Sequence, residues 1–136
     1  MNKTIKQHVF VIDDDASARN GLTRLIRAAG YHVSAFDSAN KFLESVDENR
    51  SGCILLDIRM PGMSGDELVL ELNNRKINLP IIVITADDNV YAKRKAQKMN
   101  AVGFYRKPVD GTALLDAINW IFRECSNGKN HTNFNI

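Results

Sequence analysis

Five apolar segments, each followed by a helical pattern, constrain the fold of this chain more than any other feature of its sequence. The segments span residues 8–12, 32–36, 53–56, 81–84 and 102–106. In the first helical pattern, 16–29, one face carries Leu22, Leu25, Ile26 and Ala29. Consecutive parallel strands need a right-handed crossover that covers the sheet. The alternation therefore predicts one parallel sheet with helices on both faces.

Polar residues and glycines predict where the helices begin and end. Asp15 is placed to cap the first helix, and Gly30 is placed to end it. Ser38 should cap a helix over 39–46, and a further helix should follow Gly65. The last helix runs to about Cys125, and either Asp110 or Thr112 could cap it. The core positions expected in these later helices are Phe42, Leu43, Val46, Leu68, Val69, Leu72, Leu114, Ile118 and Ile121.

The size and composition are those of one ordinary globular domain. The chain has 136 residues, of which 44% are hydrophobic and 25% charged, and its net charge of +2 is too small to argue for direct nucleic-acid binding. Two separated cysteines, Cys53 and Cys125, form neither a zinc site nor a disulfide framework. Because no signal peptide or membrane span is visible, we expect a cytoplasmic protein with no membrane partner. The expected boundaries are an N-terminal extension at 1–7, one domain at 8–125 and a disordered polar tail at 126–136.

Polar side chains follow four of the five predicted strands. Asp13 and Asp14 follow the first, Asp57 the third, Thr85 the fourth and Lys107 the fifth. Each of them alone could cap a turn. The carboxyl ends of parallel strands meet at one edge of a sheet, however, and open α/β sheets bind ligands there. The five residues together therefore predict a functional site at this edge.

Three carboxylates at one edge need a compensating cation. Two unit charges about 4 Å apart repel by roughly 4 kcal/mol at an effective dielectric constant of about 20. Ligands that are all oxygen favour Mg²⁺ first and Mn²⁺ next; the alternative is that Lys107 and water alone relieve the repulsion. Such a site suits phosphoryl transfer, in which Asp57 attacks phosphorus and Lys107, the cation and Thr85 stabilise the phosphoryl oxygens.

Four separated motifs resemble the receiver domain of bacterial two-component response regulators. They are the stretches 11–15 with Arg19, 55–65, 82–86 and 104–108, and the resemblance covers about residues 6–125. Each motif occurs in order at the expected strand end. The resemblance implies a flavodoxin-like doubly wound (βα)5 sandwich of three layers, with a parallel sheet in the order 2-1-3-4-5.

The resemblance also implies the roles of the site residues. Asp57 would be the phosphoacceptor, and Asp13 and Asp14 would hold Mg²⁺ together with Asp57 and the backbone carbonyl of Arg59. Asp14 and Asp15 are the alternative pair, but Asp13 and Asp14 are preferred because Asp15 then remains free to cap the helix.

Activation in this family involves a hydroxyl and an aromatic ring. Thr85 and Phe104 would be this switch pair. Lys107 would pair with the phosphoryl group, and in this family the peptide bond that joins this lysine to the following proline, here Pro108, is commonly cis. Tyr105 stands beside Phe104, but alternation along the strand puts the two on opposite faces. Arg59 and Asp87, two positions beyond Asp57 and Thr85, are predicted to form a salt bridge that slows the access of water.

Partners follow from the same resemblance. The donor would be a phosphohistidine on a histidine kinase or phosphotransfer protein, and it would meet the first helix. Exposed arginines are expected there, namely Arg19, Arg24 and Arg27. The fourth helix, fifth strand and last helix would form the output face, which carries Lys93, Lys95, Lys98 and Arg106. These cations suggest an acidic protein partner or a homodimer, and Trp120 would be either core packing or an exposed anchor.

The function predicted is a signalling switch that accepts a phosphoryl group and acts by binding; it is not an enzyme beyond its own phosphorylation and dephosphorylation. One alternative is the receiver portion of a longer DNA-binding transcription regulator. A second is an aspartate-nucleophile phosphatase, which usually needs an acid where this chain has Arg59. A third is a flavodoxin-like electron carrier, but three acids after the first strand would repel a bound phosphate.

Overall fold

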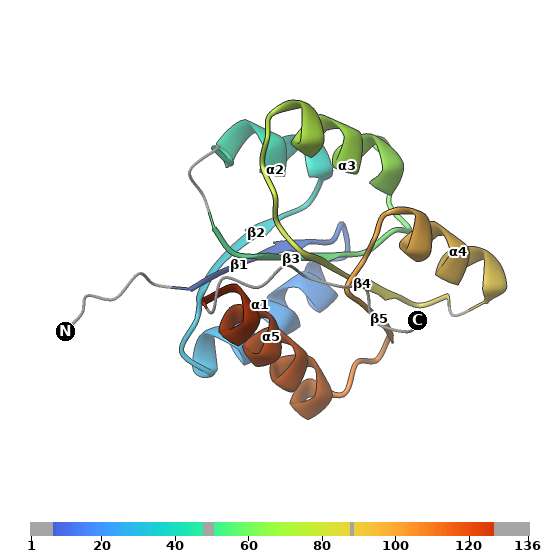
Figure 1. Cartoon of the computed structure of the whole chain (residues 1–136). Coiled ribbons are helices and arrows are strands. Elements are labelled where there is room, and N and C mark those ends of the chain that lie inside the picture. The colour runs from blue at the N-terminus through green and yellow to red at the C-terminus, as the bar shows by residue number, and fades with distance from the viewer. Residues whose placement is uncertain (1–6, 48–50, 88, 127–136) are drawn as a thin grey trace.

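A computed structural model describes residues 7–47, 51–87 and 89–126, and it contains one five-stranded parallel sheet (Figure 1). The strands are β1 (His8–Ile12), β2 (His32–Phe36), β3 (Cys53–Leu56), β4 (Ile81–Thr85) and β5 (Gly103–Arg106). Their order across the sheet is β2-β1-β3-β4-β5, and every neighbouring pair is parallel. The predicted strand order is confirmed, with β2 at one side of the sheet.

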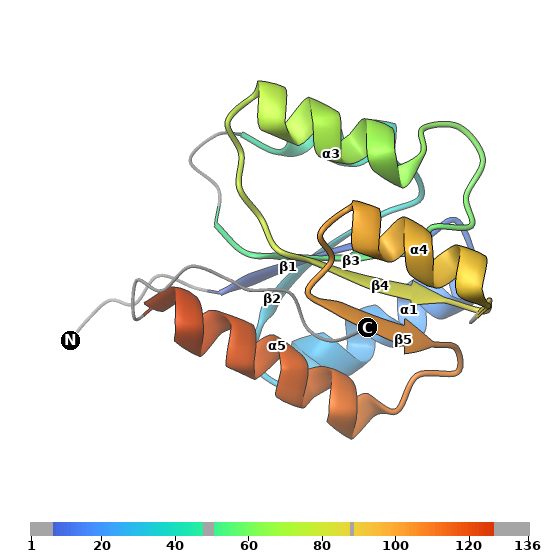
Figure 2. The same ribbon diagram turned by 45° about the vertical axis from the view of Figure 1, so that its right-hand side comes forward.

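Five helices cover the two faces of the sheet. They are α1 (Ala16–Ala28), α2 (Ala39–Ser45), α3 (Gly65–Asn74), α4 (Val90–Lys98) and α5 (Gly111–Ser126). Helices α1 and α5 lie on one face, and α2, α3 and α4 lie on the other, as the two ribbon views show (Figures 1 and 2). This arrangement is the predicted three-layer, doubly wound sandwich. None of the helices in the described residues is long and apolar enough to cross a membrane.

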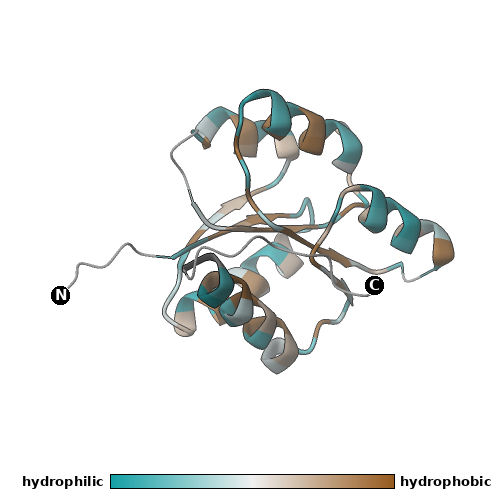
Figure 3. Ribbon diagram, viewed as in Figure 1, coloured by the Kyte–Doolittle hydropathy of each residue, from teal (hydrophilic) through white to brown (hydrophobic). Residues whose placement is uncertain are grey.

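Alternation along the strands builds a separate core on each face. Phe10 and Ile12 of β1 belong to the cluster beneath α2, α3 and α4, whereas Val9 and Val11 belong to the cluster beneath α1 and α5. The strands are almost uniformly hydrophobic, while the helices turn polar residues outward (Figure 3). Trp120 of α5 is half-buried against the second cluster, which favours the packing interpretation of that residue.

The predicted caps are present. The Asp15 carboxylate accepts a hydrogen bond from Ser17 N, and the Ser38 hydroxyl accepts one from Lys41 N. At α5 the structure selects Asp110 over Thr112, because Asp110 Oδ1 accepts hydrogen bonds from the backbone N–H groups of Thr112 and Ala113. Gly30 follows α1 with φ +102°, a conformation that glycine adopts without steric cost.

One sequence expectation about a helix end is wrong. The helical pattern places Ala29 on the inward face of the first helix, but Ala29 is exposed and caps the end of α1, because the chain already turns there toward β2. The last helix, expected to run to about Cys125, ends at Ser126. Residues 1–6, 48–50, 88 and 127–136, which include most of the predicted extension and tail, lie outside the described residues.

Gly21 stands in the interior of α1 without any packing reason. A glycine in a helix interior costs about 1 kcal/mol of stability relative to alanine. A Cβ atom added at this position would meet no other atom within 4 Å. Packing within the described chain therefore does not require glycine here.

Candidate functional site

The sheet itself positions the residues that end its strands. The backbone N–H of Asp13 donates to Phe36 O at 3.1 Å, that of Asp57 to Ile12 O at 3.1 Å, and that of Lys107 to Thr85 O at 2.8 Å. The hydrogen-bond pattern thus continues for one residue beyond β1, β3 and β5. As a result the three side chains project from a fixed backbone at the carboxyl end of the sheet.

One ammonium group joins two buried carboxylates at this end. Lys107 Nζ lies 2.7 Å from Asp13 Oδ2 and 2.9 Å from Asp57 Oδ2. Asp13 and Asp57 are only 2% and 6% exposed. Buried carboxylates without a partner are strongly unfavourable, so Lys107 makes this arrangement possible.

Burial and neighbouring charge shift the pKa values of Asp57 and Lys107 in opposite directions. Burial raises the pKa of Asp57 above its ordinary value, although the hydrogen bond and charge of Lys107 work in the other direction. Burial would lower the pKa of Lys107, but its hydrogen bonds to Asp13 and Asp57 outweigh that effect and raise it. Lys107 therefore remains a cation at neutral pH.

Asp14 completes a group of three carboxylates. One oxygen from each of Asp13, Asp14 and Asp57 can be chosen so that all lie within 4.8 Å of one another. Asp14 is exposed, whereas the other two are buried. Asp15, the alternative partner weighed from the sequence, instead turns its carboxylate to the start of α1. The cluster offers only oxygen atoms, which are the ligands that hard divalent cations prefer.

Thr85, Arg59 and Asp87 lie together beside this cluster. Thr85 is fully buried, and its hydroxyl oxygen accepts a hydrogen bond from Asp87 N at 3.3 Å. Arg59 Nε lies 3.3 Å from Asp87 Oδ2. The salt bridge predicted from the sequence is therefore present in the structure. Both of its side chains are about half exposed, so it lies at the surface of the site.

The two aromatic residues of β5 occupy opposite faces of the sheet. Phe104 packs against the cluster beneath α2, α3 and α4, and Tyr105 packs against the cluster beneath α1 and α5. Phe104 pairs with Val83 across the strands. Since side chains alternate along a strand, Thr85 lies on the same face as Val83 and Phe104. The bond between Lys107 and Pro108 is cis, as the resemblance implied.

Arg19 has a contact that the sequence did not reveal. We expected it to be exposed with Arg24 and Arg27 for a donor, and the latter two are exposed. Arg19, however, is half-buried, and its Nη1 donates to the backbone carbonyl of Asp13 at 2.8 Å. The expectation is wrong because the first turn of α1 lies against the end of β1. This bond fixes the backbone between two of the clustered carboxylates.

Comparison with known proteins identifies the architecture that carries this site. A sequence model of the response regulator receiver domain matches residues 9–119. The chain belongs to the response regulator receiver domain family. As a receiver domain, it is a signalling module of two-component systems.

Curated relatives of this receiver domain include transcription regulators. Over 121 residues it is 36% identical to the transcriptional regulatory protein FixJ of Bradyrhizobium diazoefficiens, an alignment that covers 89% of this chain and 59% of FixJ. Over 113 residues it is 42% identical to nodulation protein W of the same organism, covering 83% of this chain and 50% of the relative. The chain thus spans only about half the length of these two proteins.

Solved structures of receiver domains agree with the fold. The response regulator StyR is 42% identical, with a TM-score of 0.78 over 91% of this chain and 65% of StyR. Full-length FixJ from B. japonicum gives a TM-score of 0.79 at 36% identity, over 89% of this chain and 60% of FixJ. A CheY-like receiver domain protein from Methanospirillum hungatei, at 22% identity and a TM-score of 0.80, supports the fold alone.

Proposed function

We propose that Asp57 accepts a phosphoryl group from a phosphohistidine donor and that this modification switches the binding face of the domain. The observation that carries the proposal is the buried carboxylate of Asp57, which Lys107 contacts at 2.9 Å and two further carboxylates approach. In the reaction an Asp57 oxygen forms a bond to phosphorus while the N–P bond of the phosphohistidine breaks. The imidazole leaves with the electron pair of that bond. It departs as neutral imidazole when the other ring nitrogen of the phosphohistidine carries a proton, and otherwise it takes up a proton from water.

Lys107 acts both before and during this transfer. Before it, the ammonium group compensates the negative charges of Asp13 and Asp57. During it, the same ammonium lies where it can bind a phosphoryl oxygen as the charge on that oxygen develops. Thr85 would supply a second hydrogen bond through its hydroxyl group.

A divalent cation fits the carboxylate cluster. Asp13, Asp14 and Asp57 would hold Mg²⁺, with Mn²⁺ as the substitute, and the backbone carbonyl of Arg59 would be a further oxygen ligand. When bound, the cation supplies positive charge against the oxygens of the transferred group. The backbone N–H of Asp57 donates to Ile12 O, and Asp57 Oδ1 accepts a hydrogen bond from Arg59 N. These two bonds orient the acceptor carboxylate without the cation.

The switch would operate through Thr85 and Phe104. The Thr85 hydroxyl would turn toward the phosphoryl group, and Phe104, which is half-buried on the same face, would move into the vacated space. In the part of the chain that the structure describes, that hydroxyl accepts a hydrogen bond from the N–H of Asp87 at 3.3 Å. A bond of this length is weak, which supports a hydroxyl that can be redirected.

The charge of α4 supports an acidic partner for the output face. Its exposed cations are Lys93, Arg94, Lys95 and Lys98, and the helix contains no acidic residue. Val90 and Tyr91 beside them are 67% and 70% exposed. A two-fold symmetric contact places the same patch on both subunits. Pairing α4 with α4 would bring eight cations together, and they would repel one another. A homodimer through this face would therefore have to place α4 of one subunit against β5 or α5 of the other.

A longer protein is the second candidate context. The relatives FixJ and nodulation protein W extend well beyond the matched region, and FixJ is a transcriptional regulatory protein. By this proposal the domain would control a DNA-binding output joined to it in the same chain or bound as a separate protein. The phosphatase alternative receives no support, since Arg59 occupies the place of the second acid and pairs with Asp87.

Phosphorylation by a small donor tests the proposal directly. The protein is incubated with Mg²⁺ and acetyl phosphate, and its intact mass is measured before and after hydroxylamine, which cleaves acyl phosphates. We expect one phosphoryl group on the wild type and none on Asp57→Asn. Asp66→Asn is the matched control, because Asp66 is an exposed aspartate in the first turn of α3 and should leave the modification unchanged. A phosphoryl group retained by Asp57→Asn would overturn the assignment.

A further inference from the structure

Polar contacts attach the first turn of α1 to the end of β1. The side chain of Arg19 reaches back from the helix, and its Nη1 donates to the backbone carbonyl of Asp13 at 2.8 Å. The backbone of the same residue is fixed within the helix, since Arg19 N donates to Asp15 O at 2.9 Å and Arg19 O accepts from the Thr23 hydroxyl at 2.7 Å. Arg19 therefore connects a rigid helical turn to the strand end that carries two of the clustered carboxylates.

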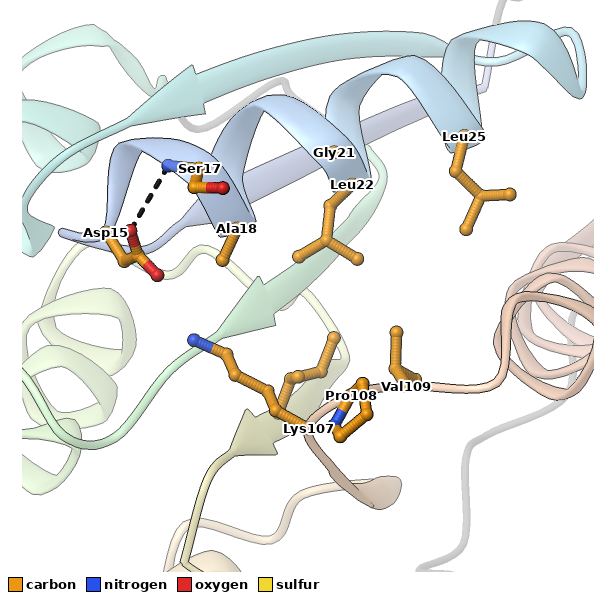
Figure 4. A pocket seen from close by; sticks show the side chains of 10 residues that line it. Asp15, Ser17, Ala18, Gly21, Leu22, Leu25, Lys107, Pro108 and Val109 are labelled. Atoms are coloured by element: carbon orange, nitrogen blue, oxygen red, sulfur yellow. Dashed lines mark hydrogen bonds between the residues drawn. The ribbon is translucent and has the colours of Figure 1, made fainter.

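A pocket beside the start of α1 makes these contacts more important. It lies between α1 and the segment after β5, and its volume is about 500 Å³. Leu22 and Leu25 of α1 extend toward Pro108 across it, and Asp15 and Lys107 lie toward one end (Figure 4). Packing across this open space contributes little to holding the start of the helix. The hydrogen bonds to the end of β1 must hold it there instead.

Both peptide groups that flank Asp14 are held by hydrogen bonds. The carbonyl of the preceding peptide, Asp13 O, accepts from Arg19, and the N–H of the following peptide, Asp15 N, donates to Asp13 Oδ1 at 2.9 Å. A peptide group is planar, so fixing its carbonyl also fixes the position of the next Cα atom. The two bonds thus set the direction in which the Asp14 side chain leaves the backbone, although that residue is exposed.

Asp14 is the carboxylate of the cluster that depends most on its backbone. In Asp13 and Asp57, Oδ1 accepts a hydrogen bond from a backbone N–H and Oδ2 accepts one from Lys107. Among the residues that the structure describes, no such bond holds the Asp14 carboxylate, yet one of its oxygens can lie within 4.8 Å of the other two carboxylates. The backbone that Arg19 fixes is what directs this carboxylate toward the cluster.

We infer that Arg19 is a positioning residue for the divalent cation: its guanidinium holds the peptide group that leads into Asp14 and so aims the Asp14 carboxylate at the cluster. The inference rests on the proposed function, because it presupposes that the three carboxylates hold such a cation. It adds a residue that touches neither the cation nor the phosphoryl group and acts only through the backbone.

The charge of Arg19 and its hydrogen bond affect cation binding in opposite directions. A guanidinium beside the cluster repels a bound cation, so removing the charge alone would strengthen binding. Loss of a group that orients a metal ligand typically weakens binding roughly 10- to 100-fold. Because Arg19 is only half-buried, water screens its charge, and the positioning effect should dominate. The sign of the change therefore distinguishes the two effects.

The test measures binding of Mn²⁺ by electron paramagnetic resonance, in which the signal of free Mn²⁺ falls as the ion binds. Arg19→Met keeps a long unbranched side chain and removes every donor, so its Kd should be about tenfold higher than that of the wild type. Arg19→Lys keeps a charged donor on a shorter side chain, and its Kd should lie between the two. Arg24→Met is the matched control, because Arg24 is an exposed arginine of the same helix and should leave the Kd unchanged.

The Mg²⁺ dependence of modification by acetyl phosphate gives a second measurement. Asp57 and Lys107 are intact in Arg19→Met, so the rate at saturating Mg²⁺ should stay close to that of the wild type. The Mg²⁺ concentration that gives half the maximal rate should rise about tenfold. A purely structural role for Arg19 would instead lower the melting temperature without moving that concentration.

The results have distinct meanings. A Kd for Arg19→Met equal to or lower than that of the wild type would overturn the inference, as would an equal loss of binding in Arg24→Met. If Arg19→Met does not fold, Arg19→Lys decides, and a Kd equal to that of the wild type would overturn the inference. Failure of the wild type to bind Mn²⁺ would instead remove the cation from the proposed function.

Discussion

At the scale of single residues, the site depends on one cation that two buried carboxylates share. Lys107 contacts Asp13 and Asp57 at 2.7 and 2.9 Å, and burial raises the pKa of Asp57 despite that contact. The lysine therefore offsets only part of the cost of placing negative charge at this edge. A further cation at the carboxylate cluster would reduce the remaining cost. An acyl phosphate carries more negative charge than the carboxylate it replaces, so the modified form would need such a cation even more.

The surface pair Arg59–Asp87 should control the lifetime of the phosphorylated form. Replacing Asp87 by alanine removes a salt bridge of 3.3 Å at the mouth of the site. An exposed pair of this kind is worth about 0.5–1 kcal/mol, so we expect dephosphorylation to become about two- to fivefold faster. The measurement is the decay of the phosphoryl group after removal of acetyl phosphate.

A second exposed pair provides the control for this effect. Arg75 Nε and Glu71 Oε2 lie 2.8 Å apart at the end of α3, and neither residue belongs to the carboxylate cluster. Glu71→Ala should leave the decay rate unchanged. A decay rate for Asp87→Ala equal to that of the wild type would count against a protective role for the pair.

At the scale of secondary-structure elements, the start of α3 fixes the segment that leaves Asp57. Ser64 accepts a hydrogen bond from Glu67 N at 3.1 Å, and the Glu67 carboxylate accepts one from Ser64 N at 2.8 Å. This reciprocal arrangement is a capping box, which satisfies two N–H groups that the helix leaves unpaired. It determines where the loop after β3 ends.

Loss of this cap should destabilise the domain by a predictable amount. Ser64→Ala removes the acceptor for Glu67 N, so the free energy of unfolding should fall by about 1 kcal/mol. Urea unfolding followed by circular dichroism measures the change. Ser45→Ala is the comparison: the Ser45 hydroxyl donates to Phe42 O near the end of α2, where alanine is a good helix former, and its stability should change little. Equal losses in the two variants would contradict a special role for the cap.

The sequence predicted most elements because their signals are local. Asp15, Ser38 and Gly30 mark helix ends through hydrogen bonds and backbone conformations within a few residues. The prediction that Ala29 lies on the inward face of α1 is wrong, because it also used only a local pattern. The 3.6-residue period continues through Ala29 in the sequence, but the chain leaves the helix there, and periodicity alone does not report that departure.

At the scale of the whole molecule, binding of Mg²⁺ should stabilise the folded domain. A ligand that binds only the folded state adds about 1.4 kcal/mol when its free concentration is ten times Kd. We therefore expect a higher melting temperature in Mg²⁺ than in NaCl of equal ionic strength. Asp14→Asn should lose most of the increase, because it removes one carboxylate of the cluster without disturbing the contacts of Lys107.

An exposed aspartate outside the cluster again provides the comparison. Asp66→Asn should keep the full thermal shift, and differential scanning calorimetry can record all three proteins with and without Mg²⁺. Identical shifts for Asp14→Asn and the wild type would exclude Asp14 as a ligand.

Tertiary structure brings in what local patterns could not show. The meeting of Asp13, Asp57 and Lys107 followed from the rules for parallel sheets, since the carboxyl ends of all strands lie on one side. The strand order followed from the family resemblance. The contact of Arg19 with the Asp13 carbonyl depends instead on how α1 sits against β1. The pocket between α1 and the segment after β5 likewise depends on how far apart these two elements lie, which no periodicity encodes.

Lys107 directly follows β5, the last strand in the chain, and this position has a consequence for biosynthesis. The ribosome makes both buried aspartates long before the lysine, which follows Asp57 by 50 positions and Asp13 by 94. A nascent polypeptide that stops short of β5 would carry two anionic groups in its interior and no counterion for them. The charge balance of the site can thus be completed only after the chain has been made past Lys107.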